Sequence, residues 1–327
     1  MQLLKVHMTY KNIQRMRHIV AVFIKHGLYS VVERMNLHRI VPFTRRFRKK
    51  GIEEELTLPE RIRLAFEELG PTFIKLGQLL STRLDILPED YIEEFRKFQD
   101  EVPSFPFEKA VSQIERELKA PISQLFQKIE EVPVAAASIA QVHRAVLLDG
   151  REAVVKVQRP GIEKTLDTDI GIMYTIANLL LRYFPELSIL DPVAIVDEFS
   201  RTIKREMDFT LEASNTVKFR EMFKEDPNVY IPEVHWEYTS KRVLTMERIK
   251  GIKVDNVEKL KEKDIDPAGV AHIIGETFLR VVMEEGFFHG DFHAGNIFVL
   301  GPERIALVDF GITGRVVREL RESLATI

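Results

Sequence analysis

The stretch from His289 to Gly311 reads HGDFHAGNIFVLGPERIALVDFG, and it decides the interpretation of the chain. Asp291 is followed five residues later by Asn296, and the tripeptide DFG at Asp309 ends the second of two short apolar runs that predict strands. Phosphoryl transfer needs a carboxylate that orients the acceptor and oxygen ligands that hold Mg²⁺ against the phosphates. The order HxDxxxxN, strand, strand, DFG provides that arrangement and therefore indicates a phosphoryl-transfer site.

A transition-metal site is the alternative interpretation of the same loop. His289, Asp291 and His293 could bind such a metal, because histidines four residues apart can share a helix face. Gly290 and Gly295 favour a loop over a helix. We therefore expect His289 to brace the loop instead of acting in catalysis.

A strand pair upstream supplies a cation for the same chemistry. The alternating runs SIAQVHRAVLL and REAVVKVQ are joined by Asp149-Gly150, which predicts a β-hairpin with Lys156 in its second strand. A lysine there would suit the α- and β-phosphates but needs a carboxylate to hold it. One of three acids in KREMDFTLEAS is expected to pair with it: Glu206, Asp208 or Glu212. The last two are one helical turn apart and can share a face.

The order of elements predicts an α+β fold with two lobes. Residues 1–128 are expected to be almost entirely helical, and the two strands are followed by a helix over about 163–184. Asp191-Pro192 should begin one long helix that Asp226-Pro227 closes. VYIPEVHW and KRVLTMER are expected to be strands, and a helix should follow at about 267–285. The predicted segments are 1–50, 51–128 with KLGQ, an N-lobe at 129–248 and a partial C-lobe at 249–327.

Composition excludes several classes of protein. The chain has 327 residues and no Cys, which excludes disulfides, thiolate catalysis and Cys-based metal sites. No apolar run approaches the roughly 18 residues that cross a bilayer. Charges interrupt the N-terminal apolar stretch, so a signal peptide is not expected. The sequence thus predicts an intracellular protein.

The first 50 residues are strongly basic, with twelve Lys or Arg and a single acid, Glu33. Apolar residues recur there near helical spacing: Ile13, Met16, Val20, Phe23, Ile24, Val31 and Met35. A basic amphipathic helix can lie on an anionic membrane or isoprenoid lipid, dock on a partner, or simply be solvated. Nucleic acid ranks last, because aromatic residues are sparse and the rest of the chain is acidic.

From about residue 55 onward the chain resembles the UbiB-type atypical kinases, a family linked to ubiquinone biosynthesis. The resemblance rests on motifs in a fixed order: KLGQ (Lys75 to Gln78), AAAS (Ala135 to Ser138), VVKV around Lys156, EMD (Glu206 to Asp208), HGDFHAGN and DFG. It implies a protein-kinase-like fold with a helical N-terminal extension. The chain ends 16 residues after Gly311, so the C-lobe is expected to be truncated.

The resemblance also implies residue roles. The alanine motif would replace the glycine-rich nucleotide loop of ordinary kinases, with less backbone freedom than glycine allows. The expected nucleotide-binding residues are Ala135, Ala136, Ala137, Ser138, Lys156 and Glu247. The expected catalytic residues are Asp291, Lys156 and its partner Glu212, and the expected metal ligands are Asn296 and Asp309. Lys75 and Gln78 would cover the protein-substrate site, held by Glu206 and Asp208.

The function that this resemblance implies is Mg²⁺-dependent binding and hydrolysis of ATP, with ATP or ADP and Mg²⁺ as ligands, in support of ubiquinone biosynthesis. The protein would be cytoplasmic and peripherally membrane-associated, with quinone-biosynthesis proteins among its expected partners. Two alternatives remain: a small-molecule phosphotransferase of the aminoglycoside or choline kinase type, and a nucleotide-binding pseudokinase scaffold.

Overall fold

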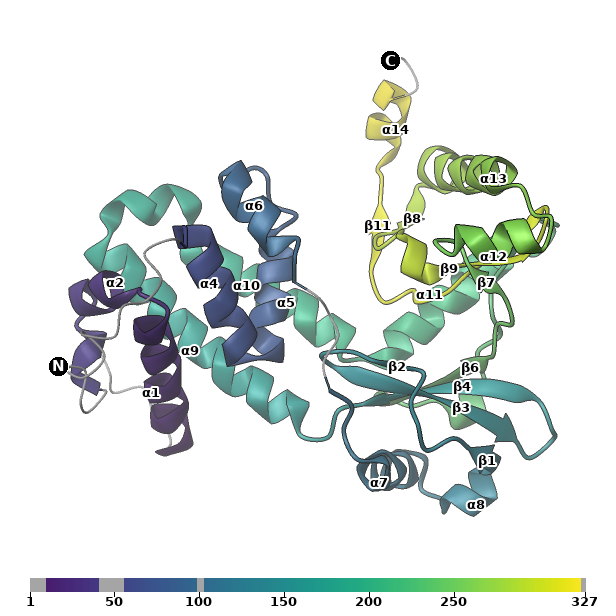
Figure 1. Ribbon diagram of the computed structural model, residues 1–327, viewed down its shortest axis with the longest axis horizontal. Helices are drawn as coiled ribbons and strands as arrows, with labels where there is room; N and C mark the ends of the chain where they lie inside the picture. Colours follow the sequence, from purple (N-terminus) through teal and green to yellow (C-terminus); the bar gives the residue numbers. More distant parts are fainter. Residues whose placement is uncertain (1–9, 41–55, 99–102, 325–327) are drawn as a thin grey trace. The chain divides into compact units, whose positions relative to one another are not determined.

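A computed structural model describes residues 10–40, 56–98 and 103–324 (Figure 1). The chain divides into two compact units. The helical unit is built from the described residues up to Ser104, with Ala136–Ile139 and Gly161–Ile203; the mixed unit contains Phe105–Ala135, Ala140–Pro160 and the residues from Lys204 onward. The four segments expected from the sequence stay a prediction.

The helical unit contains short helices with conventional start signals. Its elements are α1 (Tyr10–Lys25), α2 (Tyr29–Arg34), η1 (Leu37–Ile40), α4 (Leu58–Leu69), α5 (Pro71–Leu80), α6 (Glu89–Phe95), α9 (Ile162–Tyr183), η2 (Pro185–Leu190) and the start of α10 (Pro192–Glu206). Thr57 and Glu60 form a capping box at the start of α4. Gly70, at φ +94°, turns the chain sharply from α4 into α5, where Pro71 occupies the first helical position.

The apolar side of α1 is buried inside this unit. Met16, Val20 and Ile24 are almost fully covered, and α1 packs against α4 and α9. The Arg15 guanidinium donates to both carboxylate oxygens of Asp169 on α9, at 2.7 and 2.9 Å. Because protein covers this side of α1, its apolar residues are not free to face a membrane in this structure, and attraction of the basic segment to an anionic surface stays a prediction. The rest of the basic segment, residues 1–9 and 41–50, lies outside the described residues.

The first sheet of the mixed unit is antiparallel and carries the predicted hairpin. Its strand order is β1 (Phe126–Ile129), β3 (Ala140–Leu147), β4 (Glu152–Gln158), β6 (Val243–Glu247). Gly150 takes the left-handed conformation, φ +89°, in the β3–β4 turn. α7 (Phe107–Leu118) covers one face of this sheet, and α8 (Ile122–Leu125) leads into β1 (Figure 1). The predicted helical region therefore ends earlier than residue 128, because Phe126 pairs with Leu147 as a strand residue.

The long helix expected between Asp191 and Asp226 is wrong, because two helices occupy this region. α10 ends at Glu206, and α11 (Phe209–Met222) begins two residues later. The backbone between them bonds elsewhere: the Met207 carbonyl accepts from the Gln158 side chain at 2.8 Å, and the Phe209 N–H donates to the Lys241 carbonyl. Asp208 caps α11 by accepting from the Thr210 N–H.

A second sheet has the order β5 (Val229–Tyr230), β10 (Arg304–Leu307), β9 (Ile297–Gly301), β7 (Ile252–Lys253), and β8 (Phe287–His289) pairs with β11 (Thr313–Arg315). The predicted strand VYIPEVHW is thus only two residues long. The other elements are β2 (Ala135–Ala136), η3 (Trp236–Tyr238), α12 (Val257–Glu262), α13 (Pro267–Arg280), the π-turn η4 (Val281–Glu285), η5 (Ala294–Asn296) and α14 (Arg318–Leu324). α13 packs against β10.

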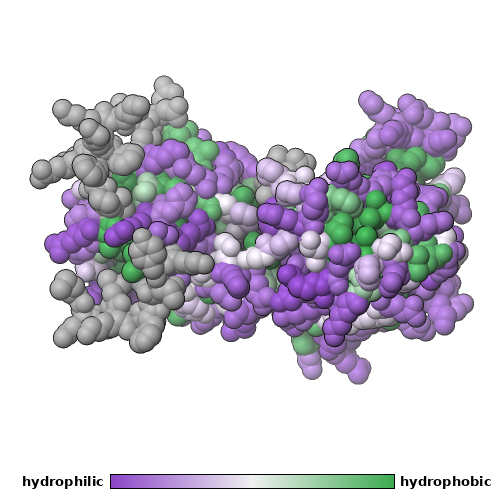
Figure 2. Space-filling view, turned by 90° about the horizontal axis from the view of Figure 1, so that it is seen from below, coloured by the Kyte–Doolittle hydropathy of each residue, from purple (hydrophilic) through white to green (hydrophobic). Residues whose placement is uncertain are grey.

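Apolar side chains from α11, the second sheet and α13 form the core of this region, with Phe219 and Phe310 fully buried. The face of the molecule in Figure 2 is mostly hydrophilic, with smaller hydrophobic areas. Within the described residues, no helix is long and apolar enough to cross a membrane.

The glycine of the KLGQ motif has a packing role that can be tested by substitution. A Cβ at Gly77 would lie 2.1 Å from a ring carbon of Phe98, whose ring is buried and stacked on Phe66. We expect Gly77→Ala to lower the free energy of unfolding by about 1–3 kcal/mol through overpacking. Gly171→Ala on α9 is the matched control, since a Cβ there meets nothing within 4 Å; it should be neutral or stabilise by about 0.5–1 kcal/mol. Equal urea midpoints for the two variants would contradict this assignment.

Candidate active site

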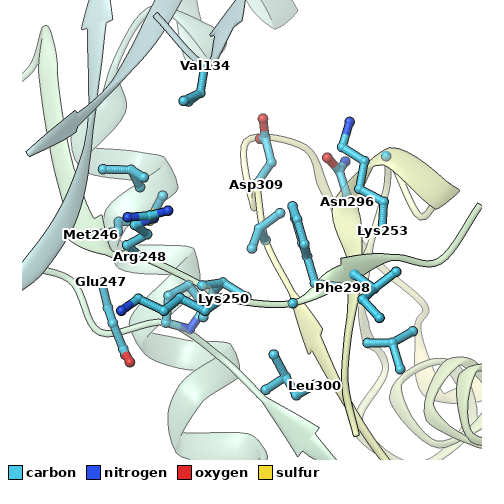
Figure 3. A pocket seen from close by; sticks show the side chains of 18 of the residues that line it. Val134, Met246, Glu247, Arg248, Lys250, Lys253, Asn296, Phe298, Leu300 and Asp309 are labelled. Atoms are coloured by element: carbon cyan, nitrogen blue, oxygen red, sulfur yellow. The ribbon is translucent and has the colours of Figure 1, made fainter. Parts of the chain in front are cut away.

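A cavity of about 1030 Å³ opens in the mixed unit between strands of its two sheets (Figure 3). Its wall combines apolar side chains with nine charged ones, six of them basic. Val142, Val154 and Met246 line it from the first sheet, and Phe298 and Leu300 line it from β9. The volume and the mixed wall suit a ligand with a flat apolar part and a charged part.

Lys156 is the central charged group of this cavity. The side chains of β4 alternate, so that Val155 and Val157 are fully buried in the core while Lys156 faces the cavity. Its ammonium donates to both carboxylate oxygens of Glu212, at 3.0 and 2.8 Å, and to Asp309 at 3.2 Å. Of the three acids that the sequence offered, Glu212 is therefore the one that pairs with Lys156.

Burial and charge act against each other in this cluster. Burial alone would lower the pKa of Lys156, but the carboxylates of Asp309 and Glu212 raise it above its usual value. Burial raises the pKa of Glu212 to about 7, against the opposing effect of the Lys156 ammonium and with the help of the nearby Asp309 charge. The lysine is thus held in its charged form.

Asp309 keeps its negative charge and remains accessible from the cavity. Burial works to raise its pKa, but the Lys156 ammonium and the Gly311 N–H hold that pKa below its usual value. The side chain is 46% exposed, and its backbone is left-handed, with φ +59°. Phe310 beside it is fully buried, with its ring 4.7 Å from that of Phe219. The buried phenylalanine therefore anchors the turn that carries the carboxylate.

His289 braces the loop of Asp291. Its Nδ1 accepts the Asp291 N–H at 3.1 Å, so Nε2 must carry the proton that it donates to the Val308 carbonyl at 3.2 Å. The ring is 3% exposed, and burial lowers the pKa of this histidine. Because both ring nitrogens are used, His289 cannot serve as a metal ligand, and the transition-metal alternative is wrong.

Asn296 and Asp309 offer oxygen donors at the same end of the cavity (Figure 3). The Asn296 amide nitrogen donates to the Asp291 carbonyl at 3.1 Å, which leaves its oxygen available. Among the residues that the structure describes, no three His, Cys, Asp or Glu form a metal cage. A carboxylate and an amide fit Mg²⁺, which usually takes few protein ligands and completes its shell with phosphates and water.

Of the remaining predicted nucleotide-binding residues, some line the cavity and others belong to the helical unit. Ala135 lines the cavity, next to Val134 whose N–H donates to the Val142 carbonyl. Glu247 lines it too, and its carboxylate accepts from the Tyr230 hydroxyl at 2.9 and 2.7 Å; its contact with a nucleotide stays a prediction. Ala136, Ala137 and Ser138 group with the helical unit, and their contact with a nucleotide stays a prediction.

The predicted regulatory residues lie on two different units. Lys75 and Gln78 are on α5 of the helical unit, whereas Glu206 ends α10 and Asp208 caps α11 in the mixed unit. A contact between these two pairs stays a prediction. The sequence interpretation missed Lys253, a cavity residue on β7; its signal, one lysine among many, was too weak to single it out.

Comparisons with known proteins agree with this geometry. Residues 97–327 match the model of the ABC1 atypical kinase-like domain. The chain is 45% identical to a probable protein kinase UbiB of Marinobacter nauticus, over 84% of this chain and 51% of that protein. It is 38% identical to the one of Aeromonas salmonicida, over 97% of this chain and 60% of that protein. The chain thus spans about half to three fifths of the length of these bacterial relatives.

Two further relatives extend the range of organisms. The chloroplastic Protein ACTIVITY OF BC1 COMPLEX KINASE 8 of Arabidopsis thaliana is 40% identical, over 84% of this chain and 38% of that protein. The solved structure of Rv3197 from Mycobacterium tuberculosis in complex with erythromycin matches with a TM-score of 0.57 and 28% identity, covering 76% of this chain and 62% of that one. The fold shared with it is kinase-like.

The raised pKa of Glu212 predicts how stability depends on pH. With a folded pKa of about 7 against an ordinary value of 4.5, the folded protein keeps a proton between these values that the unfolded chain releases. The stability that this proton contributes is fully present below the ordinary pKa of 4.5 and is lost as pH rises through the folded pKa of about 7. Glu212→Gln should therefore gain stability relative to wild type between pH 5 and pH 7, measured by urea unfolding. If the stabilities of wild type and Glu212→Gln changed with pH in parallel, the raised pKa would be contradicted. Glu237→Gln, at an exposed position, is the control for the effect of the substitution itself.

Proposed function

Because this chain belongs to the ABC1 atypical kinase-like family, we propose that it binds ATP with Mg²⁺ and cleaves the terminal phosphate in support of ubiquinone biosynthesis. One observation carries the proposal. The Lys156 ammonium contacts Glu212 and Asp309 at once, at the wall of a cavity that Asn296 also lines. A phosphate-binding cation, an acid that holds it and metal-binding oxygens therefore meet in one place.

Each residue has a distinct task in this proposal. Lys156, held by Glu212, binds the α- and β-phosphates, while Asn296 and Asp309 supply the protein ligands of Mg²⁺. When bound, Mg²⁺ neutralises charge on the phosphates. Asp291, on the loop braced by His289, orients the attacking hydroxyl or water and accepts its proton. The left-handed turn at Asp309 directs its carboxylate into the cavity, and the buried ring of Phe310 holds the turn against the core.

We propose that the KLGQ helix α5 makes this site a poor protein kinase. Lys75 and Gln78 are three residues apart and so share one face of α5. Glu206 and Asp208 are the acids that the family resemblance assigns to them. Occlusion of the peptide site would leave water or a small lipid-linked acceptor as the partner of the phosphate.

The setting of the reaction is inferred from the relatives and from charge. The bacterial relatives carry the name UbiB, which supports a role in quinone biosynthesis. Exposed cations of the basic segment would attract an anionic membrane surface, each by about 1 kcal/mol near the surface. Arg17 is one of them, whereas Lys25 and Arg34 are exposed but paired with Glu68 and Glu186. Since the solved neighbour was bound to erythromycin, a small-molecule acceptor is the second candidate.

The proposal predicts MgATP turnover without a phosphorylated protein. The purified chain is assayed for ADP release with and without anionic liposomes and an isoprenoid-like phenol, and all products are analysed. We expect Mg²⁺-dependent ADP release that liposomes stimulate and that Asp291→Asn reduces about 10²-fold or more. Lys75→Ala, which opens the peptide site in this account, should gain phosphorylation of an added peptide.

The other outcomes separate the alternatives. A phosphorylated phenol, or phosphorylated erythromycin when that compound is added, would indicate a small-molecule kinase. Tight MgATP binding with no turnover under any condition would indicate a pseudokinase scaffold. Phosphorylation of peptide by the wild type as efficient as by Lys75→Ala would contradict the proposed occlusion.

A further inference from the structure

The cavity contains cations that the family motifs do not explain. Six basic side chains line it: Arg144, Lys156, Arg248, Lys250, Lys253 and Lys263. Four of the six have acidic partners, since Arg144 faces Glu130, Arg248 and Lys250 both face Glu152, and Lys156 has its two acids. Lys253 and Lys263 form no ion pair within the part of the chain that the structure describes. These two ammonium groups are therefore available to a ligand.

Strand register places Lys253 near Asn296, one of the proposed metal ligands. Lys253 on β7 pairs with Phe298 on β9, and the Val254 N–H donates to the Ile297 carbonyl. Asn296 ends η5 immediately before β9 begins at Ile297, so this pairing places Lys253 near the end of β9 that Asn296 precedes. Lys263 follows α12 and has no such strand partner.

Figure 3 shows the same arrangement directly. The Lys253 side chain extends beside Asn296, and its ammonium lies at the end of the cavity where the Asp309 carboxylate is found. Lys253 is an exposed residue, and its long stem gives the ammonium room to follow a ligand. It approaches this end from the second sheet, whereas Lys156 approaches it from the first sheet.

The charged groups near Asp309 indicate what the Lys253 ammonium would do there. Lys156 is already engaged by Glu212 and Asp309, and the Asp291 carboxylate lies 3.5 Å from the Asn296 amide. The MgATP complex is itself an anion, so its terminal phosphate would enter beside the carboxylates of Asp309 and Asp291. A second cation would offset that repulsion, because like charges at close range in a partly desolvated site are costly.

We propose that Lys253 is an anion-binding residue of this site, whose ammonium contacts a phosphate oxygen beyond the reach of Lys156. The proposal rests on the MgATP site of the proposed function and adds a residue to it. The oxygen belongs either to the terminal phosphate of the nucleotide or to a phosphorylated acceptor beside it. Both sources present the same oxyanion, and the experiment separates them.

The test measures affinities by calorimetry for Lys253→Gln, Lys253→Arg and the control Lys259→Gln. Lys259 is an exposed lysine on nearby α12 that does not line the cavity, so it controls for net charge. Losing one charge-assisted hydrogen bond should weaken MgATP binding on the order of tenfold in Lys253→Gln. Adenosine should bind this variant as it binds wild type, and Lys253→Arg should retain most of the MgATP affinity.

A second arm identifies the source of the oxygen. Inorganic pyrophosphate is titrated into protein saturated with MgADP, as a probe for a phosphorylated acceptor. Weaker pyrophosphate binding in Lys253→Gln with unchanged MgATP binding would assign the contact to the acceptor. Unchanged affinity for both probes, in a protein whose wild type binds MgATP, would overturn the role of Lys253 and leave the proposed function intact. Failure of the wild type to bind MgATP would overturn both.

Discussion

The rest of the site depends on one ammonium group shared by two carboxylates. Lys156 is 19% exposed and Glu212 only 5%, so this pair is largely removed from water and must be matched closely to be tolerated. Removing either partner would leave a poorly solvated charge behind, which costs about 3–5 kcal/mol in comparable buried pairs. Asp309 adds a second acid at 3.2 Å, and its carboxylate keeps its negative charge beside the Lys156 ammonium. Such a cluster is predisposed to bind a cation.

Three separate pieces of local structure place these groups. The two-residue period of β4 turns Lys156 toward the cavity and its neighbours into the core. The helix break before Phe209 lets Asp208 cap α11 and places Glu212 in the first turn of that helix. The left-handed residue Asp309 is followed by a buried phenylalanine, so the carboxylate stays accessible while the ring lies in the core.

The sequence predicted those parts of the structure that follow from short-range rules. The hairpin at Asp149-Gly150, the helix of α9 and the strands around DFG follow from alternation, turn residues and caps. The break at Met207 could not be predicted, because it is made by the side chain of Gln158 and the carbonyl of Lys241, which are distant in sequence. The burial of α1 was missed for a similar reason, since an amphipathic pattern does not say whether protein or lipid covers the apolar side. Lys253 depends on the register between β7 and β9, which no motif encodes.

The central claim is that the shared ammonium marks a Mg²⁺-nucleotide site, and the most direct test is ADP affinity measured with and without Mg²⁺. Asp309→Asn keeps the size of the side chain and removes the one strongly anionic ligand that a hard cation would use. Wild type should bind ADP at least tenfold more tightly with Mg²⁺ than with EDTA, and Asp309→Asn should lose that difference. An equal gain from Mg²⁺ in both proteins would contradict the assignment of Asp309 and, with it, the account of the site.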